Sequence, residues 1–214
     1  MSSESARTRA LFLDLGKVLV DYDWPSTLSN IAEALPLTSA NDLDRWSAEA
    51  KGTVERYASG QIGSARFLTE FHDRFDPDRA VDDGWLAQRW CDMFVATPGA
   101  FELIDALRGR VRLSLLSNTN SLHFAWLDAH HRLRARFDDV VLSHEIGMLK
   151  PEEAFYTAAL EQSSVDASEA FFVDDLPENV EGAAAVGIPG AIFTGIADLR
   201  VQLAALGIAE RGLA

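Results

Sequence analysis

The chain has 214 residues, of which 48% are hydrophobic, and its 33 acidic and 19 basic side chains give a formal net charge of −14. This length allows one well-packed domain, or a core domain with a smaller insert. The negative charge repels nucleic acid and anionic membrane surfaces, so we expect neither as a partner.

Cysteine content and the first residues bear on the compartment. The one cysteine, Cys91, cannot form a disulfide within the chain, which suits a reducing environment. The opening segment MSSESARTRA has no apolar run of signal-peptide length, and the apolar stretch after it is too short and too charged to span a bilayer. We therefore expect a cytoplasmic protein; its oligomeric state is left open.

Short apolar runs alternate with helical stretches along most of the chain. Each run ends in polar residues, which is typical of strands buried on both faces of a parallel sheet. The predicted strands are ALFLDL (10–15), VRLSLLSN (111–118), DDVVLSHE (138–145), EAFFVDDL (169–176) and GAIFTG (190–195). Predicted helices lie at 98–109, 121–134, 151–163 and 177–186. This alternation predicts an α/β fold with a doubly wound parallel sheet.

The region from about Tyr22 to Ala96 has a different pattern, with helical periodicity and no convincing strand. Its predicted helices are WPSTLSNIAEAL (24–35), SANDLDRWSAEA (39–50), GSARFLTEFHDRF (63–75) and DDGWLAQRWCDMFV (82–95). We therefore predict a core formed by residues 1–21 and 97–214, into which residues 22–96 are inserted as a helical bundle of the four-helix type.

Polar and charged side chains gather where the predicted strands end. They are Asp14, Ser117, Asn118, Asp174 and Asp175, together with Lys150, which follows the third strand after a short loop. In open parallel sheets the ligand crevice lies at the carboxyl ends of the strands. Carboxylates beside a lysine and a hydroxyl fit a Mg²⁺ and phosphate site, because hard cations prefer oxygen ligands. We therefore expect Mg²⁺ as cofactor and a small phosphorylated metabolite as partner.

Four segments that contain these residues resemble the ordered motifs of the haloacid dehalogenase-like (HAD) superfamily. They are LFLDLGKVLVDYD, LSNTN, GMLKPEEAFY and FFVDDLPENVEGA, and they are similar to those of bacterial sugar-phosphate phosphatases. The resemblance implies a Rossmann-like core with the helical insert as a mobile cap over the site. It also implies a Mg²⁺-dependent phosphohydrolase whose substrate is a small metabolite, with a sugar phosphate as the expected class.

The resemblance assigns catalytic and phosphate-binding roles. Asp14 would attack phosphorus to form an aspartyl-phosphate, and Lys150 would neutralise charge on the nucleophile and on the transferred group. Ser117 and Asn118 would bind phosphate oxygens at the start of a helix, although a plain N-cap is the ordinary reading of such residues.

The resemblance also implies the metal ligands. They are Asp14, the backbone carbonyl of Gly16, and the pair Asp174 and Asp175. Adjacent carboxylates repel one another unless a cation lies beside them. Motif alignment makes Asp175 the direct ligand and Asp174 the supporting one.

One position departs from the superfamily pattern. The pattern usually has a second aspartate two positions after the nucleophile, as general acid and base, whereas this chain has Gly16. General acid–base catalysis contributes roughly 10²–10⁴ in rate, so its loss would slow phosphoryl transfer without abolishing it. Asp21 is a possible replacement, with hinge polarity as the alternative role. An anomeric sugar oxygen is a good leaving group, which predicts faster hydrolysis of glucose 1-phosphate than of glucose 6-phosphate.

Two other functions remain open. A metal-free 2-haloacid dehalogenase would share the scaffold and the aspartate, but the acidic pair and Lys150 favour phosphate chemistry. A weak or silent phosphate-binding or regulatory module would be the outcome if Gly16 abolished turnover.

Aromatic and polar residues of the insert could line a substrate pocket, although at helical spacing such side chains more often pack in a core. They are Trp24, Trp46, Arg56, Tyr57, His72, Trp85 and Trp90. His123, near the LSNTN segment, is expected at the surface or at a helix cap.

Overall fold

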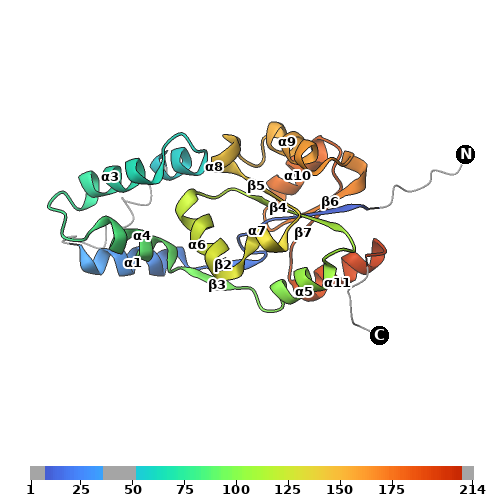
Figure 1. Ribbon diagram of the computed structural model, residues 1–214, viewed down its shortest axis with the longest axis horizontal. Coiled ribbons are helices and arrows are strands. Elements are labelled where there is room, and N and C mark those ends of the chain that lie inside the picture. Colours follow the sequence, from blue (N-terminus) through green and yellow to red (C-terminus); the bar gives the residue numbers. More distant parts are fainter. Residues whose placement is uncertain (1–7, 36–51, 209–214) are drawn as a thin grey trace, which may run out of the picture.

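The computed structural model describes residues 8–35 and 52–208. Its centre is a five-stranded parallel sheet with the order β5-β4-β1-β6-β7 (Figure 1). The strands are β1 (Ala10–Leu13), β4 (Arg112–Ser117), β5 (Asp139–Leu142), β6 (Ala170–Asp174) and β7 (Gly190–Ile192). All the predicted strands are confirmed, and β1 lies in the middle of the sheet.

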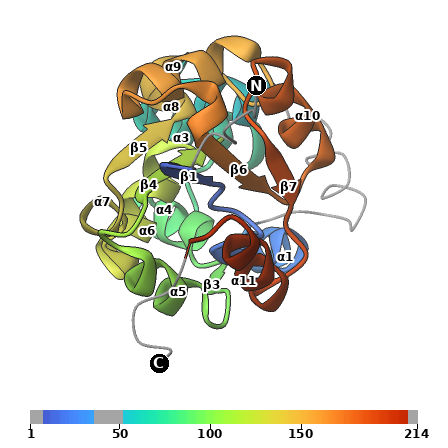
Figure 2. The same ribbon diagram turned by 90° about the vertical axis from the view of Figure 1, so that its right-hand side faces the viewer.

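Helices cover both faces of this sheet, which confirms the doubly wound prediction (Figure 2). They are α5 (Ala100–Leu107), α6 (Ser121–His131), α7 (Leu133–Arg136), α8 (Ser143–Ile146), α9 (Glu153–Ser163), α10 (Pro177–Ala185) and α11 (Ile196–Ala205), with a 3₁₀ turn at Ala167–Glu169. Successive side chains of a strand point to opposite faces. Phe12 therefore belongs to the same buried cluster as Tyr156 of α9, whereas Leu11 and Leu13 belong to the cluster of Leu103 on α5.

Two elements of the core differ from the predicted pattern. The third run is a strand only as far as Leu142, and Ser143–Ile146 form α8. The helix α11 was not predicted, although it packs Leu199 and Leu203 into the core. Among the described helices, none combines the length and the apolar character needed to cross a membrane.

The inserted region packs as helices at one end of the molecule, on the left of Figure 1. Its described helices are α1 (Trp24–Ala34), a helix at 52–58, α3 (Ser64–Phe75) and α4 (Asp83–Cys91). Tyr57, Phe67 and Trp90 form its buried centre, with ring centroids 4.6 Å apart for Tyr57 and Phe67 and 4.7 Å apart for Phe67 and Trp90. The predicted helix at 39–50, including Trp46, lies outside the described residues.

Two short strands show that the expectation of an insert without strands was wrong. β2 (Val20–Tyr22) and β3 (Phe94–Ala96) pair antiparallel where the insert leaves and rejoins the core. Each strand has only three residues, too few for an alternation of apolar and polar residues to be recognised. The two paired strands also lie far apart in the sequence. We retain residues 22–96 as the proposed cap, with this ribbon at its base.

The cap is hydrogen-bonded to the core at several points. The Tyr57 hydroxyl accepts from the Leu122 N–H at 3.0 Å, and the Ser143 hydroxyl donates to the Ala58 carbonyl at 2.6 Å. Gly60 approaches the core even more closely, because a Cβ built there would lie 2.3 Å from the carbonyl oxygen of His144. The cap therefore sits directly on α6 and α8.

We expect Gly60→Ala to destabilise the protein far more than Gly63→Ala. Gly60 has φ +70° and no room for a Cβ, whereas Gly63 has φ −87° and open space around it. Backbone strain of this kind costs about 1–3 kcal/mol before the contact with His144 is counted. The free energy of unfolding, measured by urea denaturation, is the test; equal losses in both variants would contradict this close docking.

Candidate functional site

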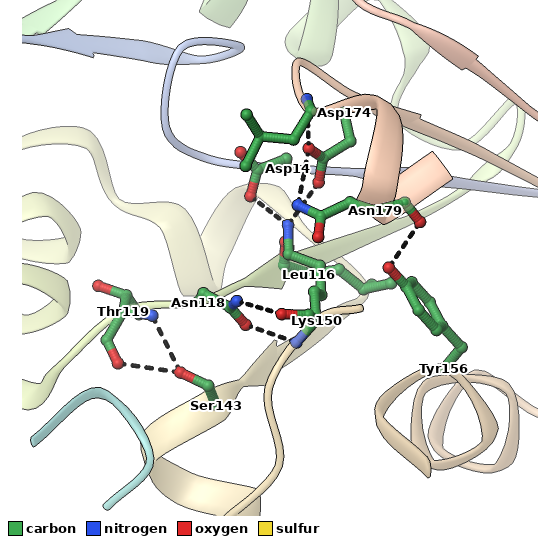
Figure 3. A network of polar contacts seen from close by, with 10 residues as sticks. Asp14, Leu116, Asn118, Thr119, Ser143, Lys150, Tyr156, Asp174 and Asn179 are labelled. Carbon is green, nitrogen blue, oxygen red and sulfur yellow. Dashed lines mark hydrogen bonds and ion pairs between the residues drawn. The ribbon is translucent and has the colours of Figure 1, made fainter. Parts of the chain in front are cut away.

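A buried lysine lies between two aspartates at the carboxyl edge of the sheet (Figure 3). Lys150 Nζ contacts Asp14 Oδ1 and Asp174 Oδ2 at 2.6 Å each, and it donates to the Leu116 carbonyl at 3.0 Å. Only 5% of Lys150 is exposed. A buried ammonium has three donors to satisfy, and these three acceptors use all of them.

The register of the sheet brings the aspartates together. Leu13 of β1 is paired with Leu115 of β4 and with Val173 of β6. The residues that follow Leu13 and Val173 in the chain are both aspartates, Asp14 and Asp174. Asp14 donates its N–H to the Val173 carbonyl at 3.0 Å. The register of β1 and β6 therefore places the two aspartates side by side, at the edge where the strand ends were expected to converge.

Asn118 holds the backbone of the lysine. Its Nδ2 donates to the Lys150 carbonyl, and its Oδ1 accepts from the Lys150 N–H, both at 2.8 Å. The sequence predicted a phosphate contact for Asn118, but this side chain is engaged with Lys150. The geometry gives it a positioning role.

Electrostatics at this edge favour a cation. Burial raises the pKa of Asp14 to about 6, although Lys150 opposes that rise. Burial also raises the pKa of Asp175, and the neighbouring Asp174 raises it further. For Lys150, burial lowers the pKa, but Asp14 and Asp174 more than reverse this and leave it raised. One lysine therefore faces three carboxyl groups, an excess of negative charge that a divalent ion would relieve.

The three carboxylates could together hold such an ion. Asp14, Asp174 and Asp175 each offer an oxygen, and these atoms all lie within 4.8 Å of one another. Asp174 is fully buried; its Oδ2 contacts Lys150, and its Oδ1 accepts from the Leu176 N–H and from Asn179 Nδ2, both at 2.9 Å. Asp175 is half-buried and lines the cavity above. This all-oxygen donor set fits Mg²⁺.

A cavity of about 340 Å³ opens above the carboxylates. Its polar floor is formed by Asp14, Gly16, Ser117, Asn118, Thr119, Lys150, Asp175 and Asn179. The structure therefore brings together all the predicted site residues except Asp21, which is not among the lining residues; Asp174 does not line the cavity but contacts Lys150 on the floor.

The ring of Tyr22 lies close to Gly16. A Cβ on Gly16 would lie 3.2 Å from Cε1 of Tyr22, a tight contact that the tyrosine ring would have to relieve by a small shift. Lys17 Nζ lies 4.4 Å from the centroid of this ring. It also donates to the Tyr22 carbonyl at 2.9 Å and to the side chain of Asp21.

Asp21 lies at the surface with an ionic partner. The hydrogen bond from Lys17 lowers the pKa of Asp21. A general acid for use near neutral pH needs a raised pKa, so this shift has the opposite sign. The acid/base role of Asp21 stays a prediction, and the geometry gives it no support.

His123 lies in the first turn of α6, where Asn120 caps its N–H at 3.0 Å as one of the two expectations had it, and its side chain lines the cavity. Its Nε2 lies 3.0 Å from the Trp90 carbonyl and its Nδ1 lies 3.0 Å from Asn120 Nδ2, so both ring nitrogens are engaged. Burial lowers the pKa of His123 to about 4, and the imidazole is neutral. Its contact with the cap could not be found from the sequence, because Trp90 is distant along the chain.

Comparison with known proteins gives phosphatases as relatives. The chain is 28% identical over 178 residues to a pyrimidine 5′-nucleotidase of Escherichia coli, a match that covers 79% of this chain and 78% of that protein. It is 37% identical over 93 residues to a sesquiterpene phosphatase of Aspergillus oryzae. That second match covers 43% of this chain, which spans less than half, 47%, of the fungal relative.

A solved structure shares the fold. It is a HAD family enzyme from Bacteroides thetaiotaomicron, in complex with magnesium and inorganic phosphate, with a TM-score of 0.79 and 24% identity over 88% of this chain and 96% of that chain. The sequence model of the haloacid dehalogenase-like hydrolases matches residues 8–187. The chain therefore belongs to the haloacid dehalogenase-like hydrolase family, as a relative of its phosphatases.

Proposed function

We propose that the protein is a Mg²⁺-dependent phosphohydrolase that transfers the phosphoryl group of a small phosphorylated metabolite to Asp14. The observation that carries this proposal is the buried Lys150 Nζ, 2.6 Å from both Asp14 and Asp174, at the floor of a cavity that Asp175 also lines. Phosphoryl transfer needs positioned positive charge more than covalent assistance, and this floor supplies a lysine and a cation site.

In the proposed first step, Asp14 attacks phosphorus. Lys150 holds its Oδ1, and we assign the attack to Oδ2. A bond forms between this oxygen and phosphorus while the bond from phosphorus to the alcohol oxygen breaks, and the departing alkoxide takes a proton from water. A water molecule then attacks the same phosphorus and breaks its bond to Asp14, which releases inorganic phosphate and a proton and regenerates the carboxylate.

Neighbouring residues complete the site in this proposal. Ser117 ends β4 and lines the cavity before α6 begins, so its hydroxyl can bind a phosphate oxygen. Asp14, Asp175 and the Gly16 carbonyl would hold Mg²⁺, with Asp174 orienting Lys150. The ion, when bound, neutralises charge on the phosphoryl oxygens.

The two alternative functions, a dehalogenase and a silent phosphate-binding module, would need different groups at this site. A metal-free dehalogenase gains nothing from a cluster of three carboxylates, which supports phosphate chemistry over dehalogenation. A weak or silent phosphate-binding module remains the second candidate, because Gly16 removes the usual acid and base. A sugar phosphate was the sequence-based expectation for the substrate, and the relatives are named for pyrimidine nucleotides, for D-ribitol 5-phosphate and for sesquiterpenes, so their names cover both polar and hydrophobic alcohols. The alcohol portion must therefore be inferred from the cavity.

We expect Asp14→Asn to abolish Mg²⁺-dependent phosphate release from a panel of phosphomonoesters. The amide cannot attack phosphorus, so the loss should reach the detection limit. Asp105→Asn, at an exposed carboxylate paired with Arg136 away from the cavity, is the matched control and should keep wild-type rates. Release that survives in Asp14→Asn, or that does not need Mg²⁺, would contradict the proposal.

We expect Gly16→Asp alone to gain little activity, because its Cβ would lie 3.2 Å from the ring of Tyr22 and the crowded carboxylate would be poorly placed. The double variant Gly16→Asp/Tyr22→Ala should hydrolyse glucose 6-phosphate faster than either single variant, by up to the ~10²–10⁴ that a general acid supplies. Steady-state rates of the wild type, the two single variants and the double variant form a double-mutant cycle. A Gly16→Asp enzyme as fast as the double variant would show that Tyr22 is not the obstacle.

A further inference from the structure

The part of the cavity lining that comes from the proposed cap is mainly apolar. The described apolar walls of the cavity include Trp24, Val54, Trp90, Met93, Phe94 and Leu127. All of these except Leu127 belong to the cap or to the ribbon at its base. We call this part the apolar half and the carboxylate end the polar floor.

The imidazole beside the apolar half is already engaged. His123 uses both ring nitrogens, toward the Trp90 carbonyl and Asn120, and its low pKa leaves it uncharged. The ring of His123 also stacks on Trp90, with centroids 5.7 Å apart and an angle of 20° between the planes. The histidine therefore contributes another flat wall.

A sugar would fit such walls poorly. A buried hydroxyl without a hydrogen-bond partner costs about 1–3 kcal/mol, and a hexose phosphate carries several hydroxyls away from its phosphate. A hydrocarbon group of similar size would gain free energy from the same surface, because its burial removes apolar area from water. The apolar half therefore opposes the sugar-phosphate expectation.

We propose that the substrate is a phosphomonoester of a hydrophobic alcohol, whose aromatic or cyclic hydrocarbon group fills the apolar half while the phosphate lies on the polar floor. This inference rests on the proposed function and names its substrate class. A phenolic alcohol would suit the site twice, because a phenoxide leaves with less help from a general acid than an alkoxide, and this chain has Gly16 where the superfamily pattern usually has that acid.

The direct test compares cyclohexylmethyl phosphate with glucose 6-phosphate in the presence of Mg²⁺. Both are phosphates of a primary alcohol on a six-membered ring, and they differ mainly in the ring oxygen and hydroxyls. We expect kcat/KM to favour cyclohexylmethyl phosphate by about 10–100-fold, since even one methylene in an apolar pocket is worth about that much. Equal values, or a preference for glucose 6-phosphate, would overturn the inference.

Neighbouring residues of β3 provide a matched pair of variants. Phe94 lines the cavity, whereas Val95 is 67% exposed. Phe94→Ser should lower the ratio of kcat/KM for cyclohexylmethyl phosphate to that for methyl phosphate about tenfold, while Val95→Ser should leave this ratio unchanged. Equal effects of Phe94→Ser on both substrates would count against the apolar half as the recognition surface.

Binding separates this inference from the proposed hydrolysis. Cyclohexylmethylphosphonate and methylphosphonate cannot be hydrolysed at an ester bond, and their dissociation constants can be measured by calorimetry on the wild-type protein with Mg²⁺. We expect the cyclohexyl compound to bind at least about tenfold more tightly. Tight binding of the cyclohexyl compound without turnover of any ester would refute the proposed hydrolysis and support the apolar half as a binding surface. Turnover of esters without this difference in affinity would support the hydrolysis and refute the proposed substrate class.

Discussion

The paired burial of Lys150 is the constraint on which the site depends. Taking an ammonium and two carboxylates out of water costs several kcal/mol per ion, roughly, and close contacts must offset that cost. Lys150 meets the requirement through Asp14, Asp174 and the Leu116 carbonyl. Asn118 fixes its backbone from the other side. In the proposed mechanism, Asp14 held this way is oriented before any substrate arrives, which would lower the reorganisation needed for attack.

The cavity has two chemically distinct ends because two parts of the chain build it. The core contributes strand ends, where polar residues are tolerated since the sheet stops there. The cap contributes helix faces whose apolar side chains are shared between its own packing and the cavity; Trp90, for example, contacts Phe67 inside the cap and Trp24 beside the cavity, with centroids 4.7 and 4.8 Å apart. In the proposed enzyme, the core would therefore bind the phosphate and the cap would bind the alcohol portion of the substrate.

The core and its polar edge could be predicted from the sequence because both follow from local patterns. Buried parallel strands appear as apolar runs, and the residue after each run must lie at the ligand edge, as for Asp14 and Asp174. Contacts between distant segments could not be predicted in this way. The β2–β3 ribbon, the ring of Tyr22 over Gly16 and the hydrogen bond from His123 to Trp90 each join residues whose sequence surroundings give no sign of the partner. Asn118 was correctly placed at the edge, but its engagement with Lys150 depends on the path of a loop.

The central claim is that Asp14 becomes phosphorylated, and trapping that species is the most direct measurement. Wild-type protein is mixed with phenyl phosphate and Mg²⁺, quenched rapidly and treated with borohydride, which reduces an aspartyl-phosphate to homoserine. The account predicts homoserine at position 14 in the peptide mass spectrum, dependent on substrate and Mg²⁺. Phosphate release with position 14 unmodified, or with the trapped phosphoryl group on another residue, would contradict it.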